Sequence, residues 1–423
     1  MSKMLDAQHA RYAGWNSCQT ADGEYRDFSK FDFERVQKDG MGKVEFEIVK
    51  KEKIENKIRL VRLSQLGADD FPSQFMHAPG LQFDKKQDKL LAWHGAHVQD
   101  GFLLRVPAGA DAGLVHLRTK AAGHSALHHV IALEKGAKAQ VIIECMGKDS
   151  SSAIHLHTDV SEALVGPDAR LTLATIQSYP ANDWAFSHHD QRLDAFASLS
   201  HAALALGAEV SRARTLNRLA GRNSRAESFQ LFLGEGRQFM DMETCSRHQV
   251  PDTGGEMSCR GALDGHGIGV YRGRIVIDRA APNTISHQSG SALLLSPDSA
   301  ADIIPSLQVD NDQVEAGHGA TVGGLDARER FYLRSRGLTD AQARRLMMEG
   351  YFQTALARMP SIGMREYLGG LIAGRLPAHA AEERPRAQKM EMTANPGLEA
   401  RPRARAGIKE PASHAESGLG EGG

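Results

Sequence analysis

An apolar strand, a glycine-containing turn and a second alternating strand recur as a unit along the middle of the chain. Examples begin at residues 106, 132 and 204, with turn glycines at Gly109, Gly136, Gly166, Gly207 and Gly234. A period of roughly 20 to 50 residues is typical of stacked repeats, in which no single repeat can bury its own apolar face. The uneven spacing favours a β-solenoid with insertions at its corners over propeller blades. The alternative is a β-sandwich, which would place hairpin turns about every 8 to 12 residues.

The segments on either side of these repeats have different patterns. Apolar and charged residues alternate from Lys43 to Leu66, which predicts one or two half-buried strands. Asp326 is placed to cap a helix that ends at Gly337, and Thr339 begins a capping box completed by Gln342. In this second helix, one face is expected to carry Ala343, Leu346, Met347 and Gly350. A third helix is expected after Pro360.

These patterns predict a mostly β protein with four parts. An N-terminal α/β region spans 1–93, the β-solenoid core 94–323 and a small helical module 324–377. Residues 378–423 lack apolar periodicity and are rich in Ala, Arg, Glu, Pro and Gly. Such a composition cannot bury enough apolar surface to fold, so a disordered tail is expected there.

Composition limits the class of protein. The 423 residues carry 51 Lys+Arg against 52 Asp+Glu, which removes the overall basic excess of a dedicated nucleic-acid binder. No run approaches the ~18 apolar residues of a membrane span. The first residues lack the apolar centre of a signal peptide, so a cytoplasmic location is expected. The four cysteines form no CxxC pair, which argues against a self-contained metal cage. Cys145, Cys245 and Cys259 fall in expected strands and are interpreted as buried small hydrophobes.

Nineteen histidines are therefore the more numerous metal-capable side chains. His155 and His157 are two apart, so on a strand both could reach one ion, but the sequence fixes no third ligand. Three other pairs occur, His94/His97, His128/His129 and His188/His189, and we expect the paired histidines to lie on an exposed face of the solenoid. His318 lies between Gly317 and Gly319, and such small neighbours let another backbone or a bound group come close. Its ring either bonds the backbone at a tight corner or serves as a metal ligand or proton carrier.

The helical module is basic, with nine arginines against five acids from Asp326 to Arg375, a net charge of +4. Nucleic acid, an acidic protein or solvent could face such a surface. Phe331 and Tyr332 stand beside Arg334 and Arg336, a composition typical of protein interface hot spots, which favours a protein partner. The chain contains no P-loop, no G-x-S-x-G elbow and no HExxH helix. An enzyme is therefore not expected, although a β-helix enzyme acting on polysaccharide remains an alternative.

Several motifs together resemble the SufB/SufD family of iron–sulfur cluster assembly proteins. They combine in the family's order and spacing, and the resemblance runs from about residue 94 to 376. The matching segments are Asp100-Gly-Phe-Leu-Leu-Arg-Val-Pro107, Leu133-Glu-Lys-Gly-Ala137, Ala292-Leu-Leu-Leu-Ser296, His318-Gly-Ala-Thr321, Phe331-Tyr-Leu-Arg-Ser-Arg-Gly337 and Gly350-Tyr-Phe352.

The resemblance implies a right-handed parallel β-helix core and a scaffold that works with the ATPase SufC. In the family, one SufB, one SufD and two SufC assemble, and ATP-driven closure of SufC remodels the SufB–SufD interface where the cluster forms. For this chain it implies a SufB-like partner, ATP on SufC only, and an iron–sulfur cluster held transiently in the complex rather than stably by the chain alone. The alternative is a self-sufficient scaffold that pairs with a second copy of itself.

The same resemblance is closest to SufD. SufB-like chains carry a cysteine before the run of leucines, where this chain has Gly290-Ser-Ala292, and SufD-like chains often carry one where Ala316 stands. His318 is then the one matched residue able to contribute to the cluster. The implied surfaces are a segment facing SufB and a site that docks SufC. The first comprises Gln288, Leu294, Pro305, His318 and Thr321, and the second Phe331, Tyr332, Arg334, Arg336 and Gly337.

Overall fold

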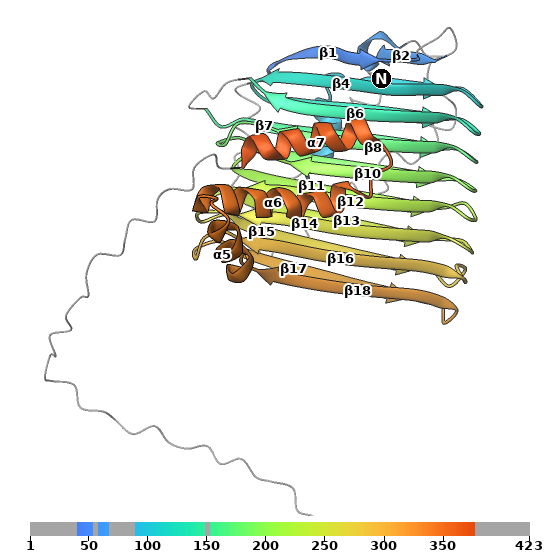
Figure 1. Ribbon diagram of the computed structural model, residues 1–423. Helices are drawn as coiled ribbons and strands as arrows, with labels where there is room; N and C mark the ends of the chain where they lie inside the picture. Colours follow the sequence, from blue (N-terminus) through green and yellow to red (C-terminus); the bar gives the residue numbers. More distant parts are fainter. Residues whose placement is uncertain (1–39, 54–57, 67–88, 149–152, 377–423) are drawn as a thin grey trace, which may run out of the picture. The chain divides into compact units, whose positions relative to one another are not determined.

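The computed structural model describes residues 40–53, 58–66, 89–148 and 153–376. Two nine-stranded sheets stack rung upon rung (Figure 1). In order, the first sheet contains β1 (Lys43–Lys51), β4 (Asp111–Ala122), β6 (Lys138–Gly147), β8 (Arg170–Ser178), β10 (Ser198–Ala205), β12 (Arg225–Gly234), β14 (Gly254–Leu263), β16 (Thr284–Leu294) and β18 (Val314–Gly323). The second contains β17 (Ala300–Val309), β15 (Ile268–Ile277), β13 (Phe239–His248), β11 (Val210–Leu219), β9 (Trp184–Leu193), β7 (Leu156–Val165), β5 (Ser125–Leu133), β3 (Phe102–Val106) and β2 (Arg59–Arg62).

From β3 to β18, each strand pairs in parallel with the strand two places along the chain. Ser198 pairs with Arg170 on one side and Arg225 on the other, so each rung is roughly 30 residues long. The chain alternates between the two sheets, and this topology is a parallel β-helix. The solenoid prediction is therefore confirmed, and the β-sandwich alternative is wrong.

The corners explain why the repeat is recognisable but uneven. Gly109 and Gly136 adopt positive φ, whereas the equivalent left-handed positions of later rungs are Asp168, Phe196 and Asn223. The backbone N–H groups of Gly109, Gly136, Asp168 and Phe196 each donate to a carbonyl in the next rung, as from Gly136 to Pro167 and from Asp168 to Ala195. The hydrogen-bonding geometry is thus conserved from rung to rung while the residue type is not.

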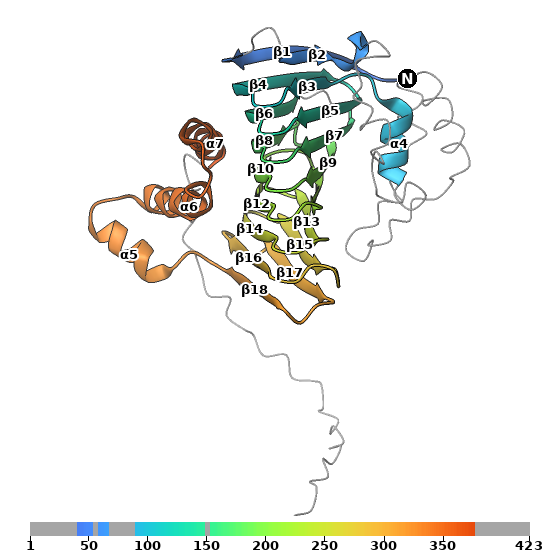
Figure 2. The same ribbon diagram turned by 90° about the vertical axis from the view of Figure 1, so that its right-hand side faces the viewer.

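Two antiparallel strands cover the first rungs. β1 pairs with β4, and β2 pairs with β3. Both lie in the segment Lys43–Leu66, so the expectation of one or two strands there is confirmed, although β1 is half-buried only at Val44 and Phe46. A 3-10 turn (Leu63–Gln65) follows β2, and helix α4 (Lys89–His97) packs on the outer face of the second sheet through Leu90 and Trp93 (Figure 2).

Three helices follow β18: α5 (Ala327–Ser335), α6 (Asp340–Leu356) and α7 (Ile362–Arg375). The Asp326 side chain accepts from the backbone N–H groups of Arg328 and Glu329, the Thr339–Gln342 capping box forms, and Gly337 has φ +96°. Helices α6 and α7 lie against the outer face of the first sheet, where Met348, Phe352 and Leu368 join an apolar cluster with Phe229 (Figure 2).

The predicted buried face of α6 is partly wrong. Ala343 is buried as expected, but Leu346 is exposed, and the buried positions are instead Met348, Phe352, Ala355 and Leu356. The side of a helix that faces a sheet depends on the route of the preceding turn, which the helical period alone does not specify. Residues 378–423, expected to be a disordered tail, and Cys18 lie outside the described residues. Within the described part of the chain, no helix is both long and apolar enough to cross a membrane.

Candidate functional site

The last rung exposes side chains that the earlier rungs bury. Ile275 and Ile277 of β15 point into the solenoid and are fully buried, and their partners one rung on are Leu307 and Val309 of β17. Leu307 is 37% exposed and Val309 41%. Side chains that share this inward-facing register are therefore buried in β15 and partly exposed in β17, because β17 is the last strand of its sheet within the described residues.

His318 occupies the corresponding position in the other sheet. It pairs with Gln288, which pairs in turn with Met257, and both of these inward residues are buried. His318 is exposed although it lies on the inward side of β18, since no further described strand covers it. Gln288 donates through Nε2 to the Ser306 carbonyl at 3.0 Å, which ties the two sheets together directly beneath this end.

The other residues expected to face SufB are divided between the two faces of the strands. Pro305 lies half-buried on the inward side of β17, where an edge strand tolerates its missing N–H. Leu294 ends β16 and packs beside the core. Thr321 points outward beside Ser291, whose hydroxyl bonds Tyr351 Oη at 2.7 Å. Inward-facing Leu307 and Val309, which sequence reasoning missed, become apparent only once the register is known.

Helix α5 has no buried residue. Phe331 is 73% exposed and Tyr332 54%, and the Arg336 guanidinium lies over the Tyr332 ring at 5.1 Å from its centroid. This pairing holds an aromatic ring and a cation together at the surface. Gly337 ends the helix directly after Arg336.

Several arginines of the helical module bind within the chain. Arg330 contacts Asp340 at 2.6 and 2.7 Å, Arg345 contacts Glu349, and Arg358 contacts Glu256. Arg334 lies 3.8 Å from Asp340. Several of the arginines that give the module its net charge of +4 are thus paired with acidic side chains, either within the module or on the solenoid. The exposed aromatic pair with Arg336 remains the most distinctive feature of this helix.

The cysteine prediction is confirmed for the three that the structure describes. Cys145, Cys245 and Cys259 are buried in β6, β13 and β14. Burial raises the pKa of all three thiols. A thiol with a raised pKa stays protonated at neutral pH and is a poor ligand for iron, because the thiolate is the binding form.

The expectation that the paired histidines lie on an exposed face is wrong. His129, His157, His188 and His189 are all buried. Polar groups inside the solenoid accommodate the inward-facing rings: His189, for example, bonds Ser161 Oγ at 2.8 Å and Thr175 Oγ1 at 3.2 Å. Hydroxyl partners thus satisfy both ring nitrogens of His189 inside the solenoid. His188 lies instead on the outer face of β9, in register with Val160 and beside α4.

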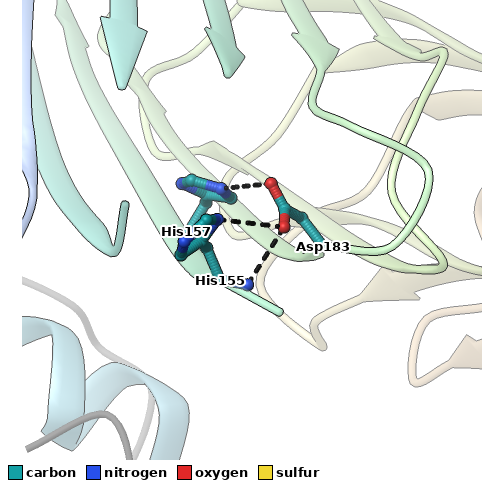
Figure 3. Close-up of side chains that lie close together, drawn as sticks. All are labelled: His155, His157 and Asp183. Atoms are coloured by element: carbon teal, nitrogen blue, oxygen red, sulfur yellow. Dashed lines mark hydrogen bonds and ion pairs between the residues drawn. The ribbon is translucent and has the colours of Figure 1, made fainter. Parts of the chain in front are cut away.

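His155 and His157 do share a site, and the structure supplies the missing third group. Asp183, from the turn before β9, lies 3.0 Å from His157 Nε2 and 3.3 Å from His155 Nδ1 (Figure 3). Burial lowers the pKa of His157, although Asp183 acts in the opposite direction. Asp183 follows His157 by 26 residues, about one rung, so only the solenoid period could have indicated it.

Together these features define a parallel β-helix protein whose last rung and outer helix are open to contact. The family model for the SufBD core domain of SUF-system iron–sulfur cluster assembly matches residues 116–351. The chain belongs to this SufBD family.

Named relatives agree with this assignment. The iron–sulfur cluster assembly SufBD family protein Rv1462 of Mycobacterium tuberculosis is 30% identical over 253 residues, 58% of this chain and 62% of the relative. The SufBD family protein ML0594 of Mycobacterium leprae is 30% identical over 249 residues, with 57% and 62% covered. A second M. tuberculosis SufBD protein, Rv1461, is 27% identical over 205 residues, 48% of this chain and 24% of that protein. The alignments thus span less than two thirds of these relatives.

Proposed function

We propose that this chain is a SufD-like, non-enzymatic scaffold subunit of an iron–sulfur cluster assembly complex. It pairs through its last rung with a cysteine-bearing SufB-like paralogue and docks the SufC ATPase on α5. The presence of two SufBD proteins in M. tuberculosis supports pairing between paralogues. The iron–sulfur cluster is the cargo of the complex, and ATP binds to SufC alone.

The uncovered core column at β17 and β18 carries this proposal. Stable partners commonly extend an exposed sheet edge, and the main-chain groups of that edge supply the affinity. Proteins discourage unwanted pairing by placing charges on edge strands. The edge strand β1 carries Lys43, Glu45, Glu47, Lys50 and Lys51, whereas β17 and β18 carry only Asp302 and Glu315 with His318. The chain therefore protects its first edge and leaves the last one apolar.

The inward side of β18 supports a limited contribution of this chain to the cluster. Iron–sulfur clusters are held mainly by thiolates. Ala316 and His318 both face inward on β18, so the inward side of the edge offers an imidazole and no thiol. The partner would supply the thiolates, and His318 would complete the site from this side.

A pair of matched substitutions tests the pairing. Leu307 and Ile304 are both 37% exposed on β17, but Leu307 faces the uncovered core and Ile304 faces outward. Leu307→Asp would bury a carboxylate in the interface, and we expect at least about a tenfold weaker association, the equivalent of ~1.4 kcal/mol. Ile304→Asp serves as the control for added charge.

The measurement is co-purification of the tagged chain with the SufB-like paralogue of the same genome, quantified by size-exclusion chromatography with light scattering. Equal association for both variants would contradict the proposed surface. Pairing of the wild-type chain only with itself, sensitive to Leu307→Asp, would favour the self-sufficient scaffold instead.

A further inference from the structure

We propose that His155, His157 and Asp183 form a binding site for a divalent first-row transition-metal ion of the Fe²⁺ to Zn²⁺ series. The site is separate from the uncovered last rung, and it does not depend on the function proposed above. It lies at a corner of the solenoid, where the chain enters β7 and, one rung later, β9. In Figure 3 the two imidazoles and the carboxylate converge on one another.

The distances from Asp183 to the two histidines fit one ion. Nitrogen and oxygen ligands lie about 2.0 to 2.2 Å from Zn²⁺, so neighbouring ligand atoms are separated by about 2.8 to 3.6 Å, depending on whether the angle at the metal is octahedral or tetrahedral. Asp183 oxygens lie 3.0 Å from His157 Nε2 and 3.3 Å from His155 Nδ1. One donor atom from each residue lies within 4.8 Å of the other two. The two imidazoles would have to move closer together for all three donors to surround one ion.

The donor set selects the class of metal. Two imidazoles and one carboxylate suit Zn²⁺ and the iron-group ions, whereas Mg²⁺ and Ca²⁺ prefer sites made entirely of oxygen. Two histidines and a carboxylate are also the donor set of non-haem iron centres with open coordination positions. The site thus matches ions of the same class that iron–sulfur assembly handles.

Neighbouring groups orient two of the three ligands. Ser125 Oγ lies 2.8 Å from His157 Nδ1. A hydroxyl can either donate or accept, so it can receive an N–H at Nδ1 and leave the Nε2 lone pair for the ion. Asp183 Oδ1 accepts the backbone N–H of His155 at 3.0 Å, which fixes the carboxylate. Tyr179 stacks on the His157 ring at 3.8 Å between centroids.

The site borders solvent through His155. The His155 side chain is 21% exposed, while His157 and Asp183 are buried. Partial exposure on one side leaves room for water as a further ligand, as in three-ligand zinc sites with an open position.

The experiment titrates the full-length chain with Co²⁺, whose visible d–d absorption reports nitrogen and oxygen coordination, and with Zn²⁺ by calorimetry. We expect His155→Ala and Asp183→Asn each to lose one bound metal ion per chain, or to bind that ion with at least about tenfold lower affinity. Ser125→Ala should weaken binding by about 10- to 100-fold, the usual effect of removing an outer partner. Circular dichroism of each variant checks that it folds, and His155→Ala, the more exposed position, remains informative if the buried variants do not.

His128→Ala is the matched control. Its side chain is 19% exposed and lies 3.2 Å from Glu162, much as His155 lies near Asp183. Its other nitrogen faces His94 at 3.3 Å, so its two partners lie on opposite sides of the ring. We expect His155→Ala to lose the bound metal ion and His128→Ala to retain it. Identical stoichiometry and affinity in the wild-type chain, His155→Ala and Asp183→Asn would overturn the proposal.

Discussion

His318 is unusual among the histidines because it faces the solenoid interior and is nevertheless open to solvent. Its register partner Gln288 is buried one rung below. A side chain in this position contributes little to the stability of the isolated chain, because it buries little surface there. Any importance it has must arise when a partner covers the last rung.

For His318→Ala we therefore expect unfolding of the isolated chain to change by less than about 0.5 kcal/mol. Cluster yield on the assembled complex should fall severalfold while the complex still forms. Glu315→Ala, an outward-facing change on the same strand, is the control. Anaerobic reconstitution followed by visible absorption measures the yield. If His318→Ala gives the same cluster yield as the wild-type chain, His318 has no role in cluster assembly.

The sequence located His318 but not its environment. Flanking glycines and the HGAT motif marked the position, whereas its inward direction followed from pairing with Gln288, a residue 30 positions earlier. Asp183 was missed for the same reason. Short spacing reveals partners along a strand, but a solenoid brings residues together one rung apart, and rung length varies with each corner.

At the scale of elements, the three C-terminal helices differ in how they are held. Met348 and Phe352 of α6 and Leu368 of α7 are buried against the first sheet, whereas α5 has no buried side chain. Local signals predicted all three helices, because N-caps, the capping box and Gly337 are encoded within a few residues. The buried face of α6 was only partly predicted, since it depends on contact with the sheet.

Tyr332→Ala combined with Arg336→Glu removes the exposed ring and the cation above it. We expect this double variant to weaken SufC binding by at least about tenfold without loss of the core fold, since aromatic and arginine side chains dominate interface energies. Surface plasmon resonance with the purified ATPase provides the measurement.

A matched control changes another exposed aromatic and a nearby arginine, at a corner of the core. Phe196→Ala with Arg192→Glu makes the same chemical changes, at side chains that are 60% and 52% exposed. Equal binding by both double variants and the wild-type chain would rule out α5 as the docking surface.

At the scale of the whole molecule, buried histidines make stability dependent on pH. Burial lowers the pKa of His129 and His189 to about 3 and that of His248 to about 4. These folded-state values lie below the unfolded value of about 6.5. The stability that neutral histidines provide is therefore complete above about pH 6.5 and is lost as pH falls.

Several acids act in the opposite direction, because burial also raises the pKa of Asp241 and of Glu235. Burial raises the pKa of Asp159 to about 7, and that of Asp190 also to about 7 despite the nearby Arg218. Both are protonated in the folded chain while the unfolded chain ionises, so they favour folding as pH falls from 7 toward about 4. The buried histidines outnumber them, because burial also lowers the pKa of His94, His188 and His201.

We expect the free energy of unfolding to fall by roughly 1 kcal/mol or more per pH unit below about pH 6, measured by urea unfolding between pH 8 and 5. His189→Gln should make this dependence shallower. His287→Gln, at a half-exposed side chain, should leave it unchanged. A stability that is flat or rises toward pH 5 would contradict the role assigned to the buried histidines.

The parallel β-helix as a whole followed from the repeat and from the family resemblance, but its uncovered end did not. Whether a strand is central or terminal depends on what pairs beside it. The inward-facing side chains of β16 are mostly buried, whereas those of β17 and β18 are largely open. That difference underlies the proposal that this end receives a partner.

Hydrogen exchange tests this central claim most directly, by following the backbone amides of β17 and β18 in the chain alone and after addition of the SufB-like paralogue. We predict that the amides on the open edge of these strands exchange quickly in the isolated chain and become strongly protected in the pair, while those of β1 do not change. Formation of the complex with unchanged exchange at β17 and β18 would contradict the account.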